Sequence, residues 1–106
     1  MTRAEAWQLL TEYTQSESLR KHALAVEAAM RRYAARFQQD VELWGVVGLV
    51  HDFDYERWPN PPDHTRQGAR ILRERGVEEE IVGAILSHAT RNWPEYPLDR
   101  PLRQAL

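Results

Sequence analysis

The most apolar segment of the sequence, residues 41–51, ends on an imidazole followed at once by a carboxylate. Its letters, "VELWGVVGLVH", are almost all apolar, and Asp52 comes next. Asp40 is a suitable N-cap for a helix over this segment. A helix that is apolar nearly all round belongs in the centre of a domain. Burying an unpartnered polar group costs free energy, and burying a charge costs more. Either His51 and Asp52 reach water where this helix ends, or a partner in the interior binds them.

Helical patterns account for most of the remaining chain. Residues 2–14 open with a capping box of Thr2 and Glu5, and residues 16–37, 64–75 and 78–92 have apolar positions at helical spacing. Proline-broken loops follow at 52–62 and 93–101, and residues 102–106 resemble the start of a sixth helix. The valines of residues 44–50 leave a strand as the alternative there, but Asp40 and the glycine spacing favour a helix. We therefore expect an all-α fold, a bundle of five to six helices.

Composition limits the classes of protein to which the chain can belong. It has 106 residues, which fits one domain, and no cysteine, which excludes disulfides and thiolate metal sites. The net charge of −2 comes from interleaved acids and bases, which argues against a nucleic-acid polymer as partner. No apolar run approaches the roughly 20 residues that span a bilayer, and the N-terminal residues lack a signal-peptide pattern. We expect a cytoplasmic protein that does not bind membranes.

The four histidines of the chain are predicted to face the interior, each from its own helix. A single histidine in a core is more often a hydrogen-bonded residue than a metal ligand. Four converging imidazoles are better explained by a shared metal ion, which satisfies all of them. The histidine of the second helix lies on a predicted inward stripe of His22, Val26, Ala29, Met30, Tyr33 and Phe37.

Asp52 can join such a site only because the central helix ends there. Adjacent helical residues point about 100° apart, so His51 and Asp52 can share an ion only where the backbone turns away. The negative end of the helix dipole favours a cation at the same place. An isolated histidine–aspartate pair is a weak signal, and a loop acid at the surface is the alternative for Asp52.

Taken together, the order of these motifs resembles the HD superfamily of metal-dependent phosphohydrolases. "HALAV" is followed by a buried helix that ends in "HD", and then by "PPDHTRQGARIL" and "IVGAILSH". The likeness covers nearly the whole chain, and it is closest to small stand-alone HD proteins. The resemblance implies a divalent metal ion bound by His22, His51 and Asp52. It also implies that His64 and His88 either hold a second ion bridged by Asp52, or touch phosphate and assist proton transfer.

The implied activity is hydrolysis of a phosphate ester or nucleotide by water attack on phosphorus, with Asp52, His64 and His88 as catalytic residues. The nitrogen and oxygen ligands suit one or two ions of Fe, Mn, Co, Ni, Zn or Mg. Asp54 and Glu56 are candidates for general acids or for residues that orient ligands. The expected partner is a small-molecule phosphate ester or nucleotide. Assembly into a homo-oligomer is left open. Four basic residues near the histidines are candidates for phosphate binding: Arg20, Lys21, Arg57 and Arg91.

Two other functions fit the same residues. HD-fold proteins with two irons oxidise a substrate with oxygen, and the pair His64 and His88 permits such a centre. A non-catalytic module that binds a ligand or partner is the third hypothesis. Its best support is a departure from the family pattern, which ends with an aspartate on a later helix. Asp99 comes too early to be this residue, so we expect residues 1–106 to be a single HD domain that is truncated at its C-terminus.

Overall fold

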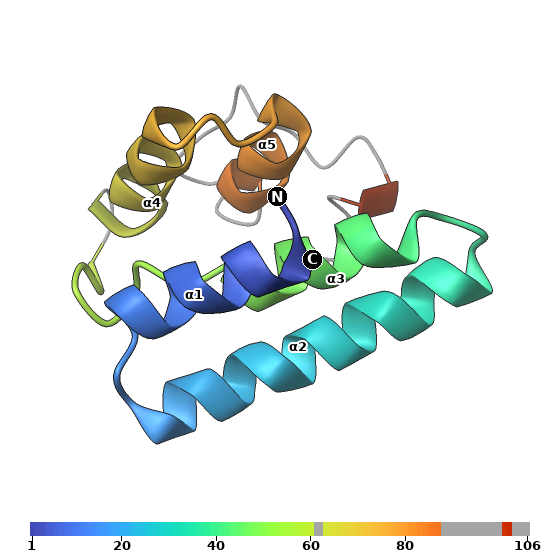
Figure 1. The fold of residues 1–106 in the computed structure, drawn as a ribbon, viewed down its shortest axis with the longest axis horizontal. Helices are drawn as coiled ribbons and strands as arrows, with labels where there is room; N and C mark the ends of the chain where they lie inside the picture. The colour runs from blue at the N-terminus through green and yellow to red at the C-terminus, as the bar shows by residue number, and fades with distance from the viewer. Residues whose placement is uncertain (61–62, 88–100, 103–106) are drawn as a thin grey trace.

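Five helices make up the fold in the computed structural model, which describes residues 1–60, 63–87 and 101–102. In the described part of the chain all regular structure is helical, so the predicted all-α bundle is confirmed. Helix α3 lies between α2 on one side and the α4–α5 pair on the other, and α1 runs alongside it (Figure 1). The helices are α1 (Arg3–Tyr13), α2 (Glu17–Arg36), α3 (Val41–Val50), α4 (Asp63–Glu74) and α5 (Glu79–Ser87).

Local sequence signals set the starts of the first three helices. Thr2 and Glu5 form the predicted capping box of α1. Ser16 caps α2 by accepting a hydrogen bond from the backbone N–H of Leu19. Asp40 caps α3 in the same way through the N–H of Leu43, at 3.0 Å. These caps satisfy backbone donors that a helix leaves without partners at its first turn.

Helix α3 is the centre of the hydrophobic core, as its composition predicts. Every residue from Trp44 to Val50 is buried. Gly48 lets the backbone of α2 approach closely, because a Cβ at this position would lie 3.0 Å from the carbonyl oxygen of Val26 and 2.9 Å from Cγ of Met30. The end of α3 is therefore held firmly against α2, and the residue after it, His51, starts the functional segment.

The buried face of α2 differs from the predicted stripe by one position. His22 is exposed, Tyr33 is 44% exposed and Phe37 is 55% exposed. One residue along a helix rotates the side chain by about 100°, and the close contact at Gly48 turns a neighbouring face toward α3. The buried face includes a glutamate, so its residues do not show the regular apolar spacing that predicts a buried stripe. The residues that α2 buries are Ala23, Glu27, Met30 and Ala34.

The sequence pattern predicts a helix over residues 64–75 with Asp63 as its N-cap, but regular helical geometry begins later than this. His64 and Thr65 have non-helical backbone angles, and Thr65 has a φ of 70°. At the other end, Gly76 has a φ of 73°, as expected for a residue that terminates a helix in the left-handed conformation. Residues 101–102 are helical and Leu102 is buried, while the rest of the predicted sixth helix lies outside the described residues.

No helix among the described residues combines the length and apolar character needed to cross a membrane.

Candidate metal centre

His51 lies directly after α3, with its ring fixed by the helix it follows. It is the C-cap residue and is 8% exposed. Its Nδ1 lies 2.7 Å from the carbonyl oxygen of Gly48. A carbonyl oxygen can only accept, so Nδ1 carries a proton and the neutral ring has its lone pair on Nε2. That nitrogen lies 3.2 Å from Oδ2 of Asp52.

His22 reaches the same place from α2. Its ring lies 5.7 Å from the ring of His51, measured between centroids. One ligand atom from each of His22, His51 and Asp52 lies within 4.8 Å of the other two. Two neutral imidazoles and a carboxylate at this separation are a suitable donor set for a divalent ion. These three residues, one from α2 and two from the turn that follows α3, are called the His–His–Asp cluster below.

His64 contacts the cluster from the start of α4. Its Nε2 lies 3.1 Å from Oδ1 of Asp52, and its Nδ1 lies 2.9 Å from Oδ1 of Asp54. The imidazole thus lies between two carboxylates. A carboxylate that holds the far nitrogen of a histidine in this way orients the ring toward a metal and fixes its tautomer.

The two carboxylates control the protonation of the histidines beside them. Burial lowers the pKa of His64, but the hydrogen bonds and charges of Asp52 and Asp54 outweigh it and raise the pKa to about 9. Burial also lowers the pKa of His51, but Asp52 and the Gly48 carbonyl together leave it raised. Without a bound metal ion, His64 is therefore an imidazolium at neutral pH.

Asp54 is buried and serves two elements at once. Its Oδ2 accepts hydrogen bonds from the backbone N–H groups of Thr65, at 2.7 Å, and Gly68, at 3.0 Å. A carboxylate at a helix N-terminus satisfies free donors and complements the dipole. Asp54 therefore caps α4 from a distant part of the chain while it also holds His64. Sequence reasoning placed Asp54 among the ligand-orienting candidates but did not foresee this capping role.

Three of the four predicted phosphate-binding residues have other partners. Arg20 donates to the carbonyl oxygens of Thr14, at 2.7 Å, and Thr11, at 3.0 Å. The Arg57 guanidinium lies 4.4 Å from the ring centroid of Tyr13. Lys21 is exposed and lies 3.4 Å from Glu17. These contacts give Arg20 and Arg57 structural roles, and phosphate binding by any of the three stays a prediction.

His88 and Arg91 lie outside the described residues, so their predicted roles are untested. Among the described residues next to the cluster, Tyr55 is 42% exposed and its ring meets that of His64 edge to face, with centroids 5.5 Å apart. Glu56 accepts hydrogen bonds from the backbone at the start of α2.

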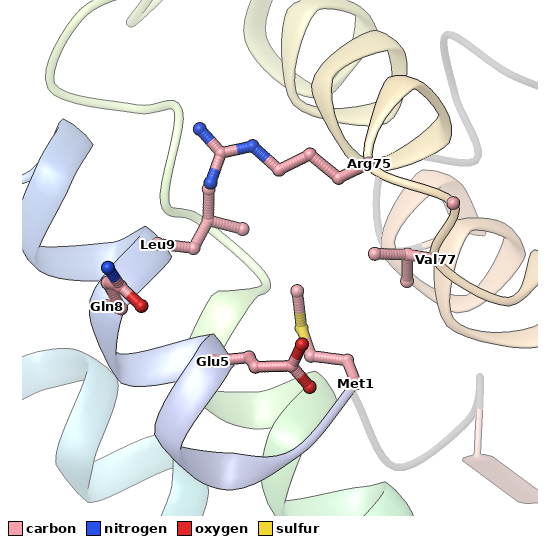
Figure 2. Close-up of a pocket in the computed structure, with 7 residues that line it drawn as sticks. Met1, Glu5, Gln8, Leu9, Arg75 and Val77 are labelled. Atoms are coloured by element: carbon pink, nitrogen blue, oxygen red, sulfur yellow. The ribbon is translucent and has the colours of Figure 1, made fainter.

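A cavity of about 220 Å³ lies elsewhere, between α1 and the turn that joins α4 to α5 (Figure 2). Its lining contains no histidine. Arg75, which points across it, donates to Glu12 at 2.7 Å. This cavity is therefore separate from the His–His–Asp cluster. The lining residues are Met1, Glu5, Gln8, Leu9, Arg75, Gly76 and Val77.

A helical domain with two histidines and an aspartate gathered at the end of its central helix has the features of a metal-binding domain. Comparison with known protein families gives the same result. Residues 19–105 match the HD domain family, and the chain belongs to that family. No solved structure matches the chain.

Proposed function

We propose that the protein is a metal-dependent phosphohydrolase that acts on a small phosphate ester or nucleotide. The observation that carries the proposal is the separation of the ligand atoms of His22, His51 and Asp52, all within 4.8 Å of one another. Membership of the HD domain family favours the same class of enzyme. The expected cofactor is a divalent ion of Fe, Mn, Co, Ni, Zn or Mg.

The charge of the cluster fits this cofactor and this class of substrate. Two neutral imidazoles and one carboxylate leave a bound divalent ion with net positive charge, which attracts a phosphate group. When bound, such an ion polarises a phosphoryl oxygen and lowers the pKa of water. His51 is prepared for binding, because the Gly48 carbonyl fixes the tautomer that places a lone pair on Nε2.

His64 has two roles open to it in this proposal. Held by Asp54, its Nε2 faces Asp52, where it can bind a second ion beside the first. As an imidazolium it can instead contact phosphate and give a proton to the departing alcohol. The first role requires Nε2 to lose its proton and the second requires the proton to stay. His88 is proposed to act with His64, and Asp52 to be essential in either case.

The test is hydrolysis of a panel of phosphomonoesters, nucleotides and cyclic nucleotides in the presence of Mn²⁺, Co²⁺, Ni²⁺ or Mg²⁺. Asp52→Ala should abolish the activity, because it removes the carboxylate that contacts both His51 and His64. Asp40→Asn is the matched control, since it changes an exposed aspartate and keeps a good N-cap. Equal hydrolysis by the wild type and Asp52→Ala would refute the proposal. Metal binding without turnover would favour the non-catalytic module, and oxygen uptake by the iron-loaded protein would favour the oxygenase.

A further inference from the structure

The acidic residues of the segment Asp52–Glu56 alternate with other residues, and each acid contacts a different part of the fold. Asp52 contacts His51 and His64. Asp54 caps α4 and holds His64. Glu56 reaches in a third direction, to the junction between α1 and α2. The cluster takes one ligand from α2, so the contact that places α2 matters for the site.

The carboxylate of Glu56 binds two consecutive backbone donors. Oε2 accepts from the N–H of Gln15 and Oε1 from the N–H of Ser16, each at 2.8 Å. Ser16 is the N-cap of α2, so the negative charge also lies at the positive end of the helix dipole. These backbone hydrogen bonds lower the pKa of Glu56, which extends the range over which it is ionised further into acid.

Two further contacts join the same parts of the chain. The hydroxyl of Thr14, which is buried, donates to the carbonyl oxygen of Phe53 at 3.1 Å. Arg20, on the first turns of α2, donates to the carbonyl oxygen of Thr14 at 2.7 Å. The junction is thus bonded both to the segment that follows His51 and to α2 itself.

We propose that Glu56 is a positioning residue that places His22 beside His51 and Asp52 by anchoring the start of α2. His22 lies six residues after Ser16, which is about 9 Å along the helix. The contact at Gly48 sets how closely α2 approaches α3, and the ion pair between Arg31 and Glu42 joins the two helices nearer the C-terminal end of α2. The N-terminal end of α2, which carries His22, is left to be held by another anchor. Glu56 supplies that anchor from the same turn that carries His51 and Asp52. The expected effect on metal binding rests on the proposed metal site. The expected effect on the distance between His22 and His51 does not depend on it.

The experiment compares the wild type with Glu56→Ala and the isosteric Glu56→Gln. In the metal-free proteins, nuclear Overhauser contacts between the ring protons of His22 and His51 report their separation. We expect these contacts to weaken in both variants, while His64 stays in place because Asp54 is intact. Glu12→Gln is the control, since it changes another exposed glutamate near the junction, one that binds Arg75. Unchanged contacts between the two rings in a folded Glu56→Gln protein would overturn the proposal.

Co²⁺ binding gives a second measurement that a general loss of stability would not reproduce. We expect Glu56→Ala to weaken Co²⁺ binding about tenfold, as is typical for residues that orient a metal ligand. The same substitution should have no further effect in a His22→Ala background, because Glu56 acts through His22. If Glu56→Ala weakened Co²⁺ binding equally with and without His22, Glu56 would not act through His22. If the wild type takes up no Co²⁺ but the ring contacts still weaken in the variants, the metal proposal fails and the positioning role stands.

Discussion

The Oδ1 atom of Asp54 lies 2.9 Å from Nδ1 of His64, and both side chains are largely buried. The other oxygen of the same carboxylate accepts two backbone hydrogen bonds at the start of α4. One carboxylate therefore orients a histidine of the candidate metal centre and also fixes the helix that carries it. Changes at Asp54 should affect stability and the site together.

Asp54→Asn should lower the free energy of unfolding by about 3 kcal/mol, because it removes a buried charge from hydrogen-bonded partners. The asparagine amide would also place an NH₂ donor against the groups that donate hydrogen bonds to Asp54, namely His64 and the N–H groups of Thr65 and Gly68. Urea unfolding at neutral pH measures the loss. Asp40→Asn, at the exposed cap of α3, should change stability by less than about 0.5 kcal/mol. Similar shifts in the two variants would contradict the assignment of Asp54 as a buried anchor.

Gly68 is the residue of α4 that makes room for this carboxylate. A Cβ at Gly68 would lie 2.9 Å from Oδ2 of Asp54 and 3.3 Å from Phe53. Gly68→Ala should therefore cost about 1–3 kcal/mol and shift the ring resonances of His64. Gly76→Ala is the control, because Gly76 has a φ of 73° and a Cβ there would meet no atom within 4 Å. It should lower stability through backbone strain and leave the His64 resonances unchanged. A shift of His64 in both variants would mean that Gly68 has no specific link to the site.

Sequence patterns predicted the parts of this fold that depend on neighbouring residues. The caps at Thr2 and Asp40 and the burial of α3 follow from short motifs, while the sequence left Ser16 and Ser18 as alternatives for the cap of α2. The face of α2 was predicted wrongly because it depends on partners far along the chain. Glu27 is buried on that face since Arg3, 24 residues away, binds it.

In the candidate site, too, the sequence predicted some features and not those that depend on contacts between distant residues. Motif order grouped His22, His51, Asp52, His64 and His88. The structure brings the first four together, and His88 lies outside the described residues. Asp54 was among the candidates for orienting ligands, and it does contact His64. The capping of α4 by Asp54 and the contact of Glu56 with the start of α2 could not be predicted from spacing, because these partners are backbone N–H groups that carry no side-chain signature. Gly68 was seen only as part of a helical pattern, although its hydrogen side chain is what admits the Asp54 carboxylate.

The close approach of α2 and α3 at Gly48 can be tested by adding a methyl group. A Cβ at Gly48 would meet backbone atoms of α2, which cannot move independently. Gly48→Ala should cost about 2–3 kcal/mol and weaken Co²⁺ binding, since α2 carries His22. Gly45→Ala meets the side chain of Arg31 instead, so the ion pairs of Arg31 with Glu27 and Glu42 would have to shift. Alanine is favoured over glycine in a helix by about 1 kcal/mol, which offsets part of this loss.

Gly45→Ala should therefore lower stability through the ion pairs of Arg31 and leave Co²⁺ binding unaffected, because it meets no backbone atom of α2. Both variants are measured by thermal unfolding and Co²⁺ titration. An equal loss of Co²⁺ binding in the two variants would show that the backbone contact at Gly48 does not place His22.

Glu27 should make the stability of the fold sensitive to acid. Burial raises the pKa of Glu27, but hydrogen bonds and charges from Arg3 and Arg31 outweigh it and leave the pKa below its ordinary value of 4.5. A carboxyl whose pKa is depressed by folding contributes stability above its unfolded pKa, and this contribution disappears as pH falls through the folded pKa. The wild type should therefore exceed Glu27→Gln in stability at pH 7, and the difference should shrink as the pH falls below about 4.3. Urea unfolding of both proteins between pH 3 and pH 7 measures this difference in stability. The other carboxylates are present in both proteins, so their titration does not contribute to the difference. A difference that stays constant over this range would mean that Glu27 contributes through packing and not through its charge.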